Sequence, residues 1–151
     1  MPRQVRRSAH EAPVVRFRMH SRRSAVAPTV ERILVFAERA GLSPERRDDL
    51  AVALAEALSN AAVHGHKEMP RALVRIRVEA LPGGQVVVDV EDSGPGFDVA
   101  TIVKVDPTDP HRLLVPGGRG VFLMRRLVDR LEFNAKGNHV RLALNGGGHR
   151  S

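Results

Sequence analysis

Two adjacent strand-like segments most limit the folds open to this chain. Within residues 71–81, Leu73, Arg75 and Arg77 alternate with Val74, Ile76 and Val78, and residues 82–84, Pro-Gly-Gly, separate this segment from the second one, 85–91. Strands with this period place every second side chain on the same face, and a short Pro/Gly segment between them indicates a hairpin. The pattern therefore predicts paired antiparallel strands whose apolar face needs a covering layer.

The other regular segments supply that layer and extend the sheet. Strand-like alternation recurs at 14–20, where Val15, Phe17 and Met19 share a face, and at 131–135 and 140–144 around a turn. Apolar residues recur at helical spacing in three segments: 28–40, 44–64 and 119–129. This order predicts an α/β (α+β) two-layer sandwich with a mixed, mostly antiparallel sheet covered on one face by helices.

Length and composition bound the organisation. The chain has 151 residues and no cysteine, which indicates one domain and excludes thiolate metal sites and thiol catalysis. We expect a basic flexible arm at 1–12, a domain at 13–145 and a flexible tail at 146–151. The long segment 92–118 predicts a loop with one short helix near 99–103. No apolar stretch is long enough to cross a bilayer, so we expect a cytoplasmic protein with no membrane partner.

The formal charge of +7 is concentrated near the N-terminus. Residues 1–23 hold seven arginines and one acid, so the rest of the chain is close to neutral. A basic arm can bind phosphates or an acidic partner, or simply be a solvated tail. Because aromatic residues make up 3% of the chain and all are Phe, the stacking platforms of single-strand binders are missing. We expect no direct nucleic-acid binding. If deletion of the arm leaves function intact, a nucleic-acid-binding role is excluded.

Three polar residues recur at four-residue spacing on the second helix. Glu56, Asn60 and His64 fall on one helical face among small apolar neighbours. The carboxylate can accept a proton from a hydroxyl or a water, and the carboxamide oxygen suits Mg²⁺. The structural alternatives are a surface glutamate, a core amide and a histidine at the helix C-terminus.

A second motif follows the strand at 85–91. Asp92 presents an acceptor at the strand end, and Gly94 and Gly96 let the backbone turn sharply beside a flat ligand. An acceptor there can bind the amino group of adenine and repels the carbonyl oxygen of guanine. The alternative interpretation is an ordinary Asp-Ser-Gly turn.

A third motif is a glycine-rich run into a helix start. Gly118, Arg119 and Gly120 precede Val121 and Phe122, where free backbone N–H groups and a cation could meet phosphate oxygens. It is not a Walker A loop, since Gly-Lys-Ser/Thr is absent. Alone, this run could equally be a flexible connector.

The three motifs together, in this order, resemble the ATP-binding domain of the GHKL superfamily. Glu56-x-x-x-Asn60-x-x-x-His64 is similar to its N box, and the motifs at Asp92 and Gly118 are similar to its two glycine boxes. Size and layout are most similar to anti-sigma-factor serine kinases of the RsbW type. That resemblance implies ATP and Mg²⁺ as cofactors, a homodimer, a sigma factor and an anti-anti-sigma (STAS-type) protein as partners, and phosphorylation of a serine or threonine on the latter.

The resemblance also implies roles for individual residues. Glu56 would be the general base, Asn60 the Mg²⁺ ligand and Asp92 the adenine anchor, with 97–117 as the ATP lid. The other ATP-binding residues would be His64, Gly94, Gly96, Gly118, Arg119, Gly120, Val121 and Phe122.

Other members of the superfamily fit less well. A histidine kinase needs a phosphoacceptor on a helical hairpin ahead of the domain, and His10-Glu11 directly precedes a strand. A topoisomerase-like ATPase needs a transducer domain, which 151 residues cannot hold. A non-catalytic ATP-binding partner-switching regulator stays open, although a pure binder has no need of Glu56.

Overall fold

The computed structural model describes residues 13–65, 72–93 and 118–146. Its elements, in chain order, are β1 (Val14–His20), a 3₁₀ turn η1 (Arg23–Ala25), α1 (Val26–Arg39), α2 (Pro44–Gly65), β2 (Leu73–Ala80), a 3₁₀ turn η2 (Pro82–Gly84), β3 (Val86–Glu91), α4 (Gly118–Leu127), β4 (Arg130–Phe133) and β5 (His139–Leu144). In the described ranges no helix is both long and apolar enough to span a membrane.

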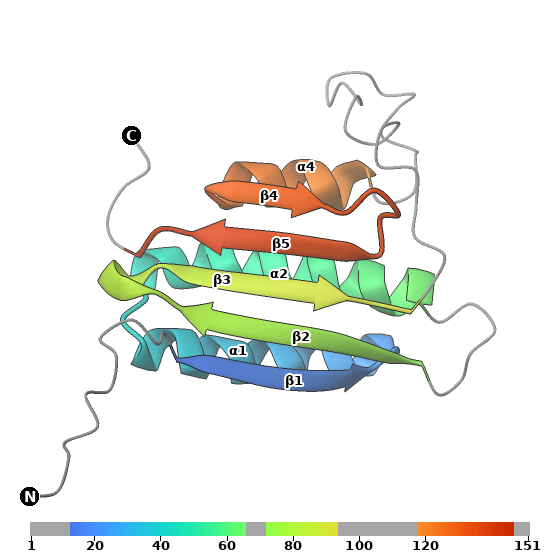
Figure 1. The fold of residues 1–151 in the computed structure, drawn as a ribbon, viewed down its shortest axis with the longest axis horizontal. Coiled ribbons are helices and arrows are strands. Elements are labelled where there is room, and N and C mark those ends of the chain that lie inside the picture. The colour runs from blue at the N-terminus through green and yellow to red at the C-terminus, as the bar shows by residue number, and fades with distance from the viewer. Residues whose placement is uncertain (1–12, 66–71, 94–117, 147–151) are drawn as a thin grey trace, which may run out of the picture.

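The strands form one antiparallel sheet in the order β1-β2-β3-β5-β4. The described helices α1, α2 and α4 all lie behind this sheet in Figure 1 and leave its near face uncovered by helices. The expected two-layer α/β sandwich is therefore confirmed. β1 is an edge strand, and its register pairs Phe17 with Ile76 of β2.

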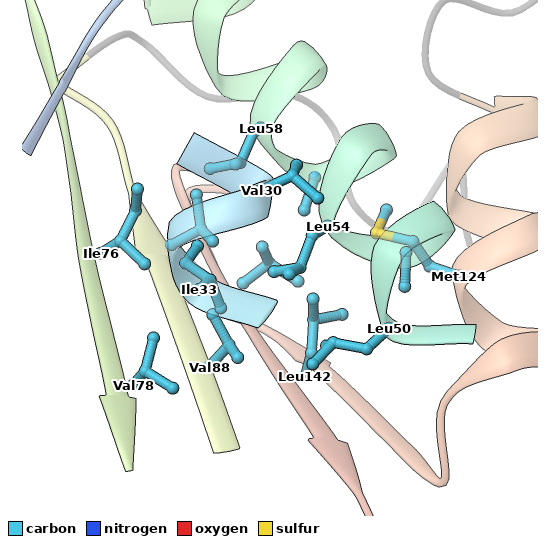
Figure 2. Packing of buried hydrophobic residues seen from close by; sticks show 14 of the residues in the cluster. Val30, Ile33, Leu50, Leu54, Leu58, Ile76, Val78, Val88, Met124 and Leu142 are labelled. Atoms are coloured by element: carbon cyan, nitrogen blue, oxygen red, sulfur yellow. The ribbon is translucent and has the colours of Figure 1, made fainter. Parts of the chain in front are cut away.

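The core lies between the helices and one face of the sheet, as Figure 2 shows. Leu50, Leu54 and Leu58 recur every four residues along α2 and are fully buried. From the sheet, Val78 and Val88 lie opposite each other in the β2/β3 register and are fully buried. Each fully buried side chain of this size contributes roughly 1.5–3 kcal/mol relative to exposure, so α2 is held in place along its length.

Local signals explain how the helices begin and end. Gly41 follows α1 with a φ of 106°, a left-handed conformation that favours glycine, and Leu42 N donates to Ala37 O at 3.0 Å. Pro44 opens α2 at its first position, and the backbone N–H of Arg46 donates to Ser43 Oγ at 3.4 Å. The predicted helix break between 40 and 44 is confirmed.

Several element bounds differ from the prediction because of tertiary hydrogen bonds. α4 ends at Leu127 rather than 129, since Asp129 N donates to Ala143 O at 2.9 Å and leads the chain into β4. β4 ends at Phe133, because the side-chain oxygen of Asn134 accepts bonds from three backbone N–H groups of the following turn. The predicted arm at 1–12 and the short helix at 99–103 lie outside the described residues.

Candidate functional site

Helix α2 places Glu56 and Asn60 side by side at the edge of the core. Both side chains are half-buried, and Ala57 and Ala61 beside them are buried. The four-residue spacing sets the pair about 6 Å apart along the helix axis. His64 lies in the last turn of α2, and its side chain is outside the described part of the chain.

The first turn of α4 lies directly against this pair. A β-carbon built on Gly120 would come within 2.6 Å of Glu56 Oε2 and 3.4 Å of Asn60 Nδ2. With Glu56 in this position, any side chain at 120 would crowd its carboxylate, so glycine at 120 lets both groups keep their places where α4 meets the polar face of α2. The structure thus brings together two motifs that are about sixty residues apart in the sequence.

The start of α4 also determines which groups face outward. Val121 is buried in the core with Met124, whereas Arg119 and Phe122 are exposed. The first N–H groups of any α-helix have no partner within the helix and carry partial positive charge. At α4 these groups belong to the turn that contacts Glu56 and Asn60, so an anion there would meet N–H donors and the carboxylate together.

Asp92 lies at the end of β3 and is 8% exposed. Its backbone N–H donates to Asn138 O at 2.9 Å, and Asn138 Nδ2 donates to Asp92 O at 3.2 Å. The turn between β4 and β5 therefore fixes the backbone of Asp92. Asn134 holds the β4–β5 turn in shape, because its Oδ1 accepts a hydrogen bond from the backbone N–H of Gly137 at 2.8 Å.

A narrow pocket connects Asp92 with Asn60. It lies among α2, β3, α4 and the β4–β5 turn, with Val90 and Met124 as apolar walls and Asn138 at its polar end. Its volume is about 350 Å³ with the open mouth included. An apolar slot with a few polar groups at its ends is typical of a small-molecule site.

Sequence reasoning missed the contribution of the β4–β5 turn. Phe133, Gly137, Asn138 and His139 all line the pocket. The turn residues at 136–138 indicated a hairpin, but nothing in the local pattern indicated that the hairpin would lie beside Asp92, more than forty residues away.

Other predicted positions lie outside the described residues. Gly94, Gly96 and the predicted lid at 97–117 belong to this group, and the side-chain environment of position 118 is likewise not described. Their predicted contacts with a base or with phosphates stay predictions. The described site consists of the pair on α2, the first turn of α4, Asp92 and the β4–β5 turn.

The donor set fits a metal ion that arrives with a phosphate ligand. Within the described ranges, no group of three or more His, Cys, Asp and Glu side chains could hold a metal ion. Glu56 and Asn60 nevertheless offer hard oxygen ligands on one face. Mg²⁺ is commonly held by one or two such groups together with phosphates and waters, so these residues fit that ion.

Comparisons with known proteins agree with this geometry. The profile of the histidine kinase-like ATPase domain matches residues 19–144. The serine-protein kinase RsbW of Oceanobacillus iheyensis is 30% identical over 102 residues, 65% of this chain and 64% of that protein. The serine-protein kinase RsbW of Staphylococcus aureus is 32% identical over 98 residues, 62% of this chain and 61% of that protein.

The fold is also found among solved structures. The histidine kinase domain of a blue-light activated histidine kinase from Erythrobacter litoralis matches with a TM-score of 0.52 and 19% identity, over 82% of this chain and 60% of that one. The match to the RsbW proteins spans less than two thirds of their length. The profile match covers most of the chain and the fold agrees with it, so the chain belongs to the histidine kinase-like ATPase domain family.

Proposed function

We propose that this protein is an ATP-dependent serine/threonine protein kinase and anti-sigma factor, which binds a sigma factor and phosphorylates an anti-anti-sigma (STAS-type) partner. The observation that carries the proposal is the approach of Gly120 to Glu56 and Asn60. It gathers a base, an oxygen ligand and a helix N-terminus at one place. Similarity to two RsbW serine-protein kinases supports the choice of reaction.

Each residue of the site has a separate task in this proposal. Glu56 accepts the proton of the acceptor hydroxyl as that oxygen forms its bond to the γ-phosphorus and the bond to the bridging oxygen of ADP breaks. Asn60 holds Mg²⁺, which offsets the negative charge of the phosphates. The first turn of α4 donates N–H bonds to phosphate oxygens, and Asp92 accepts a hydrogen bond from the adenine amino group.

A non-catalytic regulator is the second candidate. Such a protein would use the same pocket to bind ATP and would change its affinity for a partner without transferring phosphate. The position of Glu56 favours chemistry, because its half-buried carboxylate lies against the helix start that would hold phosphates. A carboxylate brought close to phosphates weakens their binding by repulsion, so a pure binder gains nothing from it.

The two candidates are separated by Glu56→Gln with labelled ATP and a purified STAS-type partner. We expect unchanged or tighter ATP binding by calorimetry and a phosphotransfer rate lower by about 10²–10⁴. Glu45→Gln is the matched control, because Glu45 is exposed on the same helix, about 16 Å away along the axis. Equal transfer by Glu56→Gln would remove Glu56 as the base. ATP-dependent partner binding with no transfer by the parent protein would establish the second candidate.

A further inference from the structure

The sheet face opposite the described helices carries a cluster of arginines. β1 and β2 pair so that Arg16 lies opposite Arg77 and Arg18 lies opposite Arg75. These side chains point away from the core, because the residues that alternate with them, such as Met19 and Ile76, are buried beneath the helices. In Figure 1 this is the near face of the sheet.

Carboxylates on the same face neutralise only part of this charge. Asp89 of β3 accepts from Arg141 Nε at 2.8 Å and lies 3.0 Å from His139 Nε2. The hydrogen bond to Asp89 raises the pKa of Arg141. Arg77 pairs with Glu79 at 3.0 Å and lies 3.9 Å from Asp89.

The other arginines on β1 and β2 are Arg16, Arg18 and Arg75. Among the residues that the structure describes, no carboxylate forms an ion pair with Arg16, Arg18 or Arg75. Like charges placed directly opposite each other on neighbouring strands destabilise a sheet. The β1/β2 pairing of arginines is therefore unfavourable in itself, and the carboxylates of β3 lie opposite only the β2 arginines, Arg75 and Arg77.

The same side chains line a shallow hollow of about 1520 Å³ with its open side included. Five arginines lie along it, at 16, 18, 75, 77 and 141, together with the carboxylates Asp89 and Glu91. Glu91 is directly opposite Arg75 in the β2/β3 register. The positive charge is thus strongest over β1 and β2 and falls toward β3.

We propose that Arg16, Arg18, Arg75 and Arg77 form a docking surface for an acidic segment of a partner protein. A guanidinium donates two parallel hydrogen bonds to one carboxylate, so spaced arginines suit the discrete carboxylates of aspartate and glutamate. The pair of Arg141 and Asp89 already shows this geometry, with bonds of 2.8 and 3.3 Å. The surface lies across the sheet from α2 and α4, and among the described residues that line either hollow, only His139 lines both this surface and the proposed ATP pocket.

Protein carboxylates fit this surface better than a nucleic acid does. Asp89 and Glu91 line the same hollow and would repel a continuous run of phosphates. The Phe17 ring lies on the helix side of the sheet, with the guanidinium carbon of Arg32 on α1 5.4 Å from its centroid. On the arginine face, the described residues therefore offer no Phe, Tyr or Trp ring for base stacking, and the one imidazole there, His139, lies 3.0 Å from the carboxylate of Asp89.

The test measures binding of a fluorescent peptide of alternating glutamate and glycine to the full-length chain, by anisotropy at about 0.1 M salt, where the screening length is about 10 Å. We expect Arg18→Glu/Arg75→Glu to weaken binding by about tenfold or more. The matched control is Arg3→Glu/Arg39→Glu, which changes the net charge equally and places one substitution on the exposed side of α1. We expect the control to lose less than about threefold.

A second variant separates docking from folding. Arg18→Thr removes one arginine of a like-charge pair, leaves Arg75 opposite Glu91 and introduces a residue that favours strands, so we expect a higher melting temperature together with weaker peptide binding. A lower melting temperature would overturn the proposal. Equal losses of peptide binding in the two glutamate variants would also overturn the proposal, as would tighter binding of single-stranded DNA than of the peptide. A third contrary result is a dimer of this chain that Arg18→Glu/Arg75→Glu dissociates while peptide binding persists.

Discussion

Gly120→Ala should separate catalysis from stability at the contact between α4 and α2. The added β-carbon would lie 2.6 Å from Glu56 Oε2, whereas nonbonded heavy atoms prefer about 3.5–4.0 Å. The carboxylate must therefore withdraw by roughly 1 Å. It can do so without moving the helices, because the crowded atom is the far end of a flexible side chain.

The expected effect on the rate is large and the effect on folding is small. A displacement of about 1 Å in a catalytic group can cost roughly 100-fold in rate, so we expect phosphotransfer to fall by about that factor. Alanine is favoured over glycine in a helix by up to about 1 kcal/mol, which offsets the strain of moving Glu56. The melting temperature should therefore stay within a few degrees of the parent value.

Initial rates with labelled ATP and circular-dichroism melts on the same samples provide the assay. Glu56→Asp shortens the crowded side chain by one methylene. In the double variant with Gly120→Ala, the fold-loss in phosphotransfer rate should therefore be smaller than the product of the fold-losses of the two single variants. The reasoning is refuted if Gly120→Ala transfers phosphate at the parent rate, if its loss of activity accompanies unfolding, or if the two substitutions are fully additive.

Two further substitutions test other parts of the structure. Asp92→Asn should weaken ATP binding by about 10- to 100-fold, because a charge-assisted hydrogen bond contributes about 1.5–3 kcal/mol; equal affinity of the parent for ATP and GTP in calorimetry would contradict the adenine role. Arg46→Met should lower the free energy of unfolding by about 2–3 kcal/mol, since this 5% exposed arginine bonds Asp49 at 2.5 Å and Asp129 at 2.6 Å. Arg47→Met is the control, as Arg47 is more exposed and pairs at the surface, and equal urea midpoints for the two variants would disprove the role of the buried network.

Most of the fold could be predicted because its determinants are local. The patterns in residues 71–81 and 85–91 are properties of each segment by itself, and the structure has strands within both, at Leu73–Ala80 and Val86–Glu91. Helix ends that depend on distant partners could not be placed in this way. The end of α4 at Leu127 depends on a hydrogen bond from Asp129 to Ala143, which belongs to a strand formed later in the chain.

In the candidate site, too, the features within one helix could be predicted and the contacts between elements could not. The four-residue spacing of Glu56 and Asn60 places them on one face of any helix that contains them, and the structure has them so. The support of Asp92 by Asn138 could not be anticipated, because it depends on the order of β3 and β5 in the sheet. The predicted roles of Gly94 and Gly96 stay predictions.

The sequence by itself determined the strands, the helices and the polar face of α2, since residue periods of two and about four act within one element. Only the tertiary structure decided that Gly120 meets Glu56 and that the arginines of β1 lie opposite those of β2. Strand register and helix packing couple residues about sixty positions apart, and their energies belong to pairs of elements rather than to either element alone. For that reason the sequence placed Arg16 and Arg18 in one strand, but only the β1/β2 register placed them opposite Arg77 and Arg75.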